Sequence, residues 1–149
     1  SVDAPPFWRT ALGREGPVDR WQICQFVAPS NVIIDVGVAP VGMGATLECH
    51  DQGVRGFVID CMTPETETSM HYFWGMARNF AQDDRGFSGR MKAMQAGVFA
   101  EDIVVLEAQQ RSIAANPNEK LRAYNIDQGG VRARQIIERL RAAEQAERP

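Results

Sequence analysis

The chain has 149 residues, enough for one domain with a hydrophobic core. Its 44% hydrophobic and 23% charged residues exclude a disordered chain, and its net charge of −3 argues against broad electrostatic binding to nucleic acid. No apolar run approaches the roughly 18 residues that a membrane span requires, and no signal peptide is evident. The three cysteines form no CxxC pair, which favours free thiols in a reducing cytoplasm over the alternative of a disulfide.

The first 17 residues contain several prolines and glycines, which predict an irregular lead-in. Beyond them, alternating apolar and polar residues separated by turn formers predict four or five consecutive antiparallel strands. The expected strands are residues 18–28, 32–39, 45–51, 55–62 and 66–79. Because side chains alternate along a strand, Ile34 and Val36 are predicted to share one face, and Val58 and Asp60 one face of another strand.

A long helix is predicted over residues 88–116, with Ser88 as its N-terminal cap and Pro117 after its last residue. Apolar residues recur along it at steps of three, four and seven, which predicts one buried stripe. The stripe comprises Met91, Met94, Val98, Val105 and Leu106.

A second helix is predicted over residues 131–146, after a pair of glycines. Its predicted buried face comprises Ile136, Ile137, Leu140 and Ala143. Its arginines are predicted to form a solvated face, with a partner surface as the alternative. The element order predicts an α+β fold in which an antiparallel sheet packs on a long helix and a C-terminal helix follows, with a cavity between sheet and helix.

Asp102 lies in line with Met94 and Val98 on the long helix, on or beside the predicted stripe. An ionised carboxylate there is costly unless it is paired or bound to a metal. Spacing alone favours an Asp102 that lies at the edge of the stripe and touches water or pairs with an arginine. His50 and His71 are too far apart for a short helical metal motif, so each is interpreted as a surface or core histidine. The residues alone predict no particular reaction.

Three blocks of sequence resemble Rieske non-haem iron aromatic oxygenases of the vanillate O-demethylase and dicamba monooxygenase type. They are DVGVAPVG (35–42), CMTPETETSMHYFWGMARNF (61–80) and VFAEDIVVLEAQQ (98–110). The resemblance implies part of a helix-grip (START-like) domain, in which the sheet wraps the long helix. It also implies that residues 1–149 are the C-terminal portion of the catalytic domain, without the Rieske domain and without the two iron-ligand histidines.

In this family two histidines and one carboxylate hold a mononuclear Fe(II), and the matching carboxylate is Asp102 rather than Glu101. The resemblance further implies a [2Fe–2S] Rieske cluster in the missing N-terminal domain and NAD(P)H acting through a separate reductase component. It implies a homotrimer for the full-length protein and a substituted aromatic substrate, such as a methoxybenzoate, that is demethylated or hydroxylated. The isolated chain is then expected to be inactive and to bind iron weakly or not at all.

The resemblance places the substrate pocket on the sheet and the long helix. The implied substrate-binding residues are Ile34, Val36, Val58, Asp60, Tyr72, Trp74, Gly75, Met94 and Val98. Related enzymes can carry a histidine at the position of Asp60 to hold a substrate carboxylate. An aspartate would repel an anionic acid and favour a hydroxyl or amine donor, unless Asp60 pairs with an arginine or with the missing half. The alternative function is a non-enzymatic helix-grip module that binds a small hydrophobic ligand.

Overall fold

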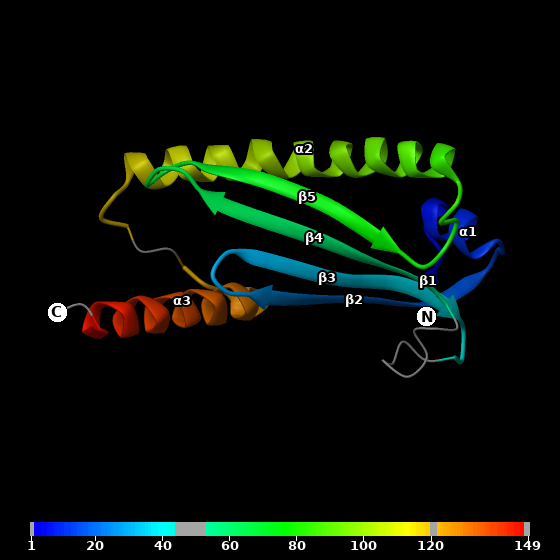
Figure 1. Ribbon diagram of the computed structural model, residues 1–149, viewed down its shortest axis with the longest axis horizontal. Coiled ribbons are helices and arrows are strands. Elements are labelled where there is room, and N and C mark those ends of the chain that lie inside the picture. The colour runs from blue at the N-terminus through cyan, green and yellow to red at the C-terminus, as the bar shows by residue number, and fades with distance from the viewer. Residues whose placement is uncertain (1, 44–52, 120–121, 148–149) are drawn as a thin grey trace. The chain divides into compact units, whose positions relative to one another are not determined.

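The computed structural model describes residues 2–43, 53–119 and 122–147, and it confirms the α+β class. Five antiparallel strands lie side by side in chain order (Figure 1). They are β1 (Val2–Asp3), β2 (Pro17–Val27), β3 (Asn31–Pro40), β4 (Val54–Pro64) and β5 (Met70–Arg78). The helices are α1 (Pro6–Leu12), α2 (Arg85–Ala115) and α3 (Gln128–Glu147), with a 3₁₀ turn at Asn125–Asp127. Within the described ranges no helix is long and apolar enough to cross a membrane.

The chain divides into two compact units. One contains the sheet, α1 and α3, and runs to Ala81 and again from Asp127. The other, Gln82–Ile126, contains α2. The predicted strand 45–51 lies outside the described residues. The described sheet has five strands because the N-terminal β1, which was not predicted, pairs with β2.

The sheet is built around β3, which pairs along its length with β2 and β4. Ile34 lies opposite Val58, and Val38 lies opposite Val54, so these four side chains share one face. Val38 and Val18 are almost completely buried, which places the tightest packing at this end of β2 and β3. We call this side of the sheet the site face and the other side the reverse face.

The irregular lead-in predicted for residues 1–17 is wrong. β1 pairs with the start of β2, and α1 follows it and lies against β3 and β4. Proline at the first position of α1 costs no hydrogen bond, and Gly13, with φ of 70°, ends the helix in the left-handed conformation. Trp8 of α1 is buried, and its ring centroid lies 6.3 Å from that of Phe80. Proline and glycine therefore bound a short helix here.

The long helix ends where predicted but begins earlier. Its first residue is Arg85, and its cap is Asp84, whose carboxylate accepts a 2.8 Å hydrogen bond from the backbone N–H of Phe87. Ser88 lies inside the first turn and donates its hydroxyl to the Asp84 carbonyl. Asp and Ser are comparable as helix caps, so the choice of Ser88 over Asp84 could not be made from residue type alone. The last residue is Ala115, capped by Asn116.

The predicted buried stripe of α2 is mostly wrong. The buried residues of the helix are Phe87, Met91 and Phe99, whereas Met94 and Val98 are exposed. Two more predicted stripe residues, Val105 and Leu106, are also exposed. Apolar residues occur on several sides of α2, so periodicity alone did not select one side.

The second predicted helix is confirmed as α3, which also includes the two preceding glycines. Its predicted buried face is wrong, because none of its described residues is buried. Ile136 and Ile137 are only partly covered, and Leu140 and Ala143 are exposed. Arg132, Arg134, Arg139 and Arg141 are exposed, as predicted for a solvated face.

A buried ion pair on the reverse face joins β2, β3 and β4. Asp35 accepts two hydrogen bonds from the guanidinium of Arg55, at 3.0 and 2.6 Å, and a third of 3.0 Å from the indole N–H of Trp21. The Arg55 guanidinium also lies 4.4 Å from the centroid of the Phe57 ring. Bidentate geometry and the indole donor satisfy the carboxylate, which is only 8% exposed.

Gly37 allows this arrangement, because it lies directly between Trp21 and Arg55 in the sheet register. A Cβ atom at Gly37 would overlap the Trp21 ring and the backbone oxygen of Val54. Trp21 therefore covers the Gly37 backbone at a distance that no larger residue permits.

We predict that Gly37→Ala lowers the free energy of unfolding by about 1–3 kcal/mol, because the methyl group displaces Trp21 from Asp35. Gly75→Ala is the matched control on the same sheet face, since a Cβ there meets nothing within 4 Å. Urea denaturation of the two variants measures the difference. Equal stability of both variants would contradict this account of the ion pair.

Candidate functional site

Six of the predicted substrate-binding residues lie together on the site face. Across the strands, Ile34 is opposite Val58 and Asp60 is opposite Trp74. Val36 and Tyr72 complete the group by strand alternation from these pairs. Val36, Val58 and Asp60 are buried, whereas Ile34, Tyr72 and Trp74 are half-buried. These six residues therefore consist of five apolar or aromatic side chains and one carboxylate, that of Asp60.

Gly75 does not belong to this group. It pairs with Ile59, and both residues lie on the reverse face. Residues one apart on a strand point to opposite sides, so Trp74 and Gly75 do not share a face. Gly75 can therefore contribute to the site face only through its backbone.

The polar feature of the site face is a hydrogen bond between neighbouring strands. The hydroxyl of Tyr72 on β5 donates to Oδ1 of Asp60 on β4 at 3.0 Å. Asp60 is 6% exposed, and the residues directly opposite it are Val32 on β3 and Trp74 on β5. An acceptor is therefore held at a fixed point on a largely apolar surface, which is the composition of a small-molecule site.

The other predicted site residues, Met94, Val98 and Asp102, lie on α2. Their spacing of four places them on one line along the helix. All three are exposed, as is the neighbouring Glu101. Asp102 makes no hydrogen bond or ion pair with any residue that the structure describes, so its carboxylate is available to a ligand.

The described part of the chain contains no group of three His, Cys, Asp or Glu residues that could hold a metal ion. His71 is exposed on β5, with its Nε2 atom 3.6 Å from the carboxylate of Glu65. His50 and Cys49 lie outside the described residues, and Cys24 and Cys61 are free thiols. The described residues thus supply isolated ligands but no complete metal site.

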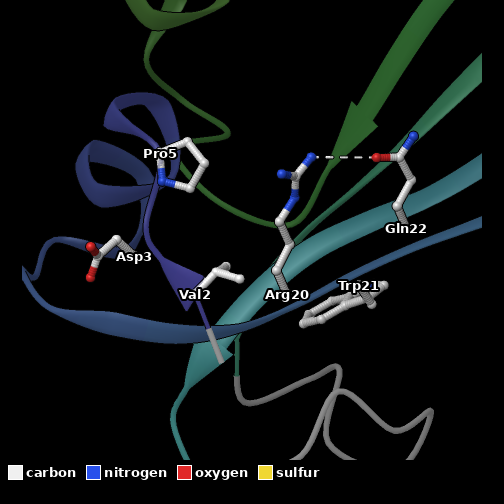
Figure 2. A pocket seen from close by; sticks show the side chains of 6 residues that line it. All are labelled: Val2, Asp3, Pro5, Arg20, Trp21 and Gln22. Carbon is white, nitrogen blue, oxygen red and sulfur yellow. Dashed lines mark hydrogen bonds between the residues drawn. The ribbon is translucent and has the colours of Figure 1, made fainter.

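A shallow hollow lies beside β1 (Figure 2). Its β2 residues pair with residues 36–38 of β3, whereas Asp60 pairs with Val32 near the other end of that strand. Val2, Asp3, Pro5, Arg20, Trp21 and Gln22 line it. The Arg20 guanidinium donates a 3.4 Å hydrogen bond to the side-chain oxygen of Gln22, two residues further along β2. These groups include no nucleophile with a base and no set of metal ligands, so the group of residues around Asp60 and Tyr72 is the better candidate.

Sequence reasoning missed the Trp21–Asp35–Arg55 group. The sequence did contain a signal for this group, since an aspartate interrupts the apolar strand 32–39 and an arginine is the second residue of the next described strand. Strand alternation predicted that Asp60 shares a face with Val58, which the structure confirms. It did not predict the hydrogen bond from Tyr72, because that contact depends on how β4 and β5 pair.

Comparison with known proteins identifies relatives over almost the entire chain. The chain is 51% identical to a vanillate O-demethylase oxygenase subunit of Pseudomonas sp. (strain ATCC 19151) over 96% of its length, which is 45% of that protein. It is 34% identical to the dicamba O-demethylase oxygenase component of Stenotrophomonas maltophilia, covering 90% of the chain and 39% of the relative. The chain therefore spans less than half the length of these relatives.

A solved structure agrees with this relationship. The crystal structure of apo dicamba monooxygenase matches 91% of this chain and 42% of its own, with a TM-score of 0.78 and 33% identity. This match supports the expected helix-grip class. A model of the vanillate O-demethylase oxygenase C-terminal domain matches residues 1–143. The chain therefore belongs to the vanillate O-demethylase oxygenase C-terminal domain family.

Proposed function

We propose that this chain is the C-terminal portion of the catalytic domain of an oxygenase that demethylates or hydroxylates a substituted aromatic, such as a methoxybenzoate. The observation that carries the proposal is the 51% identity to a vanillate O-demethylase oxygenase subunit over 96% of the chain. A relative from Comamonas testosteroni is named as an iron–sulfur subunit of a toluene-4-sulfonate monooxygenase system. These names support an oxidoreductase that works with iron and a separate reductase.

The described residues fit an iron site only in part. Asp102 offers one exposed carboxylate, which is one ligand of the three in a facial triad of two histidines and a carboxylate. In this proposal the two histidines and the Rieske [2Fe–2S] cluster belong to the part of the relatives that this chain does not span. Bound iron would supply the activation of dioxygen, with electrons from NAD(P)H through a reductase. The full-length protein is proposed to be a cytoplasmic homotrimer.

The site face is proposed to bind and orient the aromatic ring. The half-buried rings of Tyr72 and Trp74 offer flat apolar surface, and Ile34 and Val58 extend that surface across the sheet. These groups exclude water from one side of a bound ring. In this proposal Asp60 is the polar group that sets the orientation of the bound ring.

A second candidate is a non-enzymatic module that binds a small hydrophobic ligand on the same face. The exposed position of Asp102 is compatible with this function as well as with a ligand role. The two candidates differ in whether Asp102 affects iron content, which the following experiment measures.

We predict that a protein extended upstream to the full length of the relatives binds iron and demethylates a methoxybenzoate in the presence of dioxygen and a reductase. Asp102→Ala should reduce iron content at least about tenfold and abolish turnover, because removal of an outer-shell partner already costs 10- to 100-fold in affinity. Metal analysis and formaldehyde release are the measurements.

Glu101→Ala is the matched control, because it removes the adjacent exposed carboxylate on the same helix. It should retain both iron and turnover. An extended protein without iron, or iron and turnover that survive Asp102→Ala, would refute the oxygenase proposal and leave the binding module.

We predict that the 149-residue chain alone shows no dioxygen-dependent turnover and weak or no iron binding, since one carboxylate cannot hold ferrous iron tightly. Titration with ferrous iron under anaerobic conditions measures the affinity. Tight stoichiometric binding would show that this chain contains a complete site and would contradict the assignment of the histidines to the unspanned part.

A further inference from the structure

We propose that, in the full-length protein, β1 is the end of a longer strand whose upstream part runs along β2 and completes that edge of the sheet. The inference rests on the proposed function in one respect, because that function places further sequence before this chain. It goes further by stating where the upstream segment binds, in which direction it runs and which residues it pairs with.

The first support is the direction of β1. Val2 pairs with Val18 and Asp3 pairs with Pro17, so β1 and β2 are antiparallel. In this register each residue further upstream lies opposite a residue further along β2. The position six residues before Val2 therefore lies opposite Cys24, which is six residues after Val18. In the described sheet β1 covers only the first two of the eleven residues of β2 on this side.

The second support is the direction of the backbone groups of β2. The N–H of Met62 on β4 donates to the carbonyl of Ser30, just before β3, so the even-numbered residues of β3 bond to β4. The odd-numbered residues of β3 then bond to the odd-numbered residues of β2. The even-numbered residues of β2 direct their N–H and C=O groups to the outer edge, where Val18 faces β1. The next four residues with this direction are Arg20, Gln22, Cys24 and Phe26.

The third support is the regularity and exposure of β2. Its register with β3 is continuous from Val18 to Val27, without a bulge, and its one proline is its first residue, Pro17. Residues 22–25 are all exposed, so the middle of the strand is open on both faces of the sheet. A long regular edge of this kind pairs with a further strand unless it is covered.

The hollow in Figure 2 lies where the upstream segment would begin to pair. Val2, Asp3 and Pro5 line it on the side of β1, and residues 20–22 line it on the side of β2. These β2 residues follow Val18 in the direction in which β1 would continue. A strand that continued β1 would therefore enter this hollow.

The choice of occupant follows from the connectivity of the chain and from the length of its relatives. This chain covers 45% of the vanillate O-demethylase oxygenase subunit, and the family model that it matches describes a C-terminal domain. Under the proposed function the remaining sequence precedes β1. A segment joined directly to β1 has a high effective concentration at the β2 edge, whereas a second copy or a separate peptide must bind from solution.

Hydrogen–deuterium exchange at single-residue resolution tests the inference on the 149-residue chain and on the protein extended upstream to the length of its relatives. The backbone amides of Gln22, Cys24 and Phe26 should exchange at least about tenfold more slowly in the extended protein, because they gain strand partners. The amides of Ile23 and Gln25 are the matched controls, since they face β3 in both proteins. Their exchange should slow by a smaller factor.

A disulfide tests the register. A cysteine placed six residues before Val2 in the extended protein should form a disulfide with the free thiol of Cys24 on mild oxidation. Residues that exchange hydrogen bonds across such a pair have Cα atoms about 5.5 Å apart, a distance that a disulfide spans. Cysteines placed five or seven residues before Val2 should not react, because their side chains point to the opposite face. Cys24→Ser should abolish the cross-link, and peptide mass spectrometry identifies the linked residues.

The inference is overturned if the even-numbered amides of β2 are not slowed more than the controls, or if positions five or seven react in place of position six. Slow exchange in the 149-residue chain that increases with its concentration would also overturn it, because a second copy would then occupy the edge. If a cysteine variant fails to fold, the exchange of the unsubstituted proteins decides.

Failure of this inference is separate from failure of the proposed function, because neither measurement requires iron. A register-specific cross-link in an extended protein without iron would keep the strand and refute the oxygenase. Iron-dependent demethylation without slowed exchange or cross-link would do the reverse.

Discussion

The contact between Asp35 and Arg55 fixes the sheet on which the candidate site depends. It joins β3 to β4, and the Trp21 indole extends it to β2, so three strands are tied at one point. A slip of one residue between strands would exchange the two faces of the sheet and break all three hydrogen bonds. The same register places Val58 and Asp60 on the site face. The ion pair on the reverse face therefore forms in the same register that places Val58 and Asp60 on the site face.

The two buried carboxylates of the described residues have different partners and lie on opposite faces of the sheet. Asp35 faces a guanidinium and an indole N–H in fixed geometry, and the nearby Gly37 is required for the fit. Such an arrangement confers register and is complete within the sheet. Asp60 accepts from the neutral hydroxyl of Tyr72 and lies among apolar side chains on the face with the half-buried aromatic rings. The Tyr72 hydrogen bond joins β5 to β4, just as the Arg55 contact joins β4 to β3.

The sequence predicted what strand alternation controls and failed where contacts distant in the chain decide. The main strands follow from a period of two, which also predicts which residues of one strand share a face. The resemblance implied the six residues of the site face, and it grouped Gly75 with Trp74 against that period. The α1 helix was missed because its prolines and glycine suggested an irregular segment, although proline is favourable at a helix start. The hydrogen bond from Tyr72 to Asp60 depends on the register between β4 and β5, which the predicted order of the strands does not specify.

Asp102, the proposed metal ligand on the long helix, is harder to place from the sequence than the residues of the sheet. Ile103, Val104, Val105 and Leu106 directly follow Asp102, and each is between 43% and 68% exposed. Four successive apolar residues point in all directions around a helix, so the segment has no single apolar side and periodicity selects none. A helix of this kind is stable when other segments surround it. Under the proposed function those segments lie in the portion of the relatives beyond this chain, together with the partners of Asp102. Under that proposal the carboxylate and the apolar residues beside it would be buried in the same step, and iron binding would be coupled to completion of the fold.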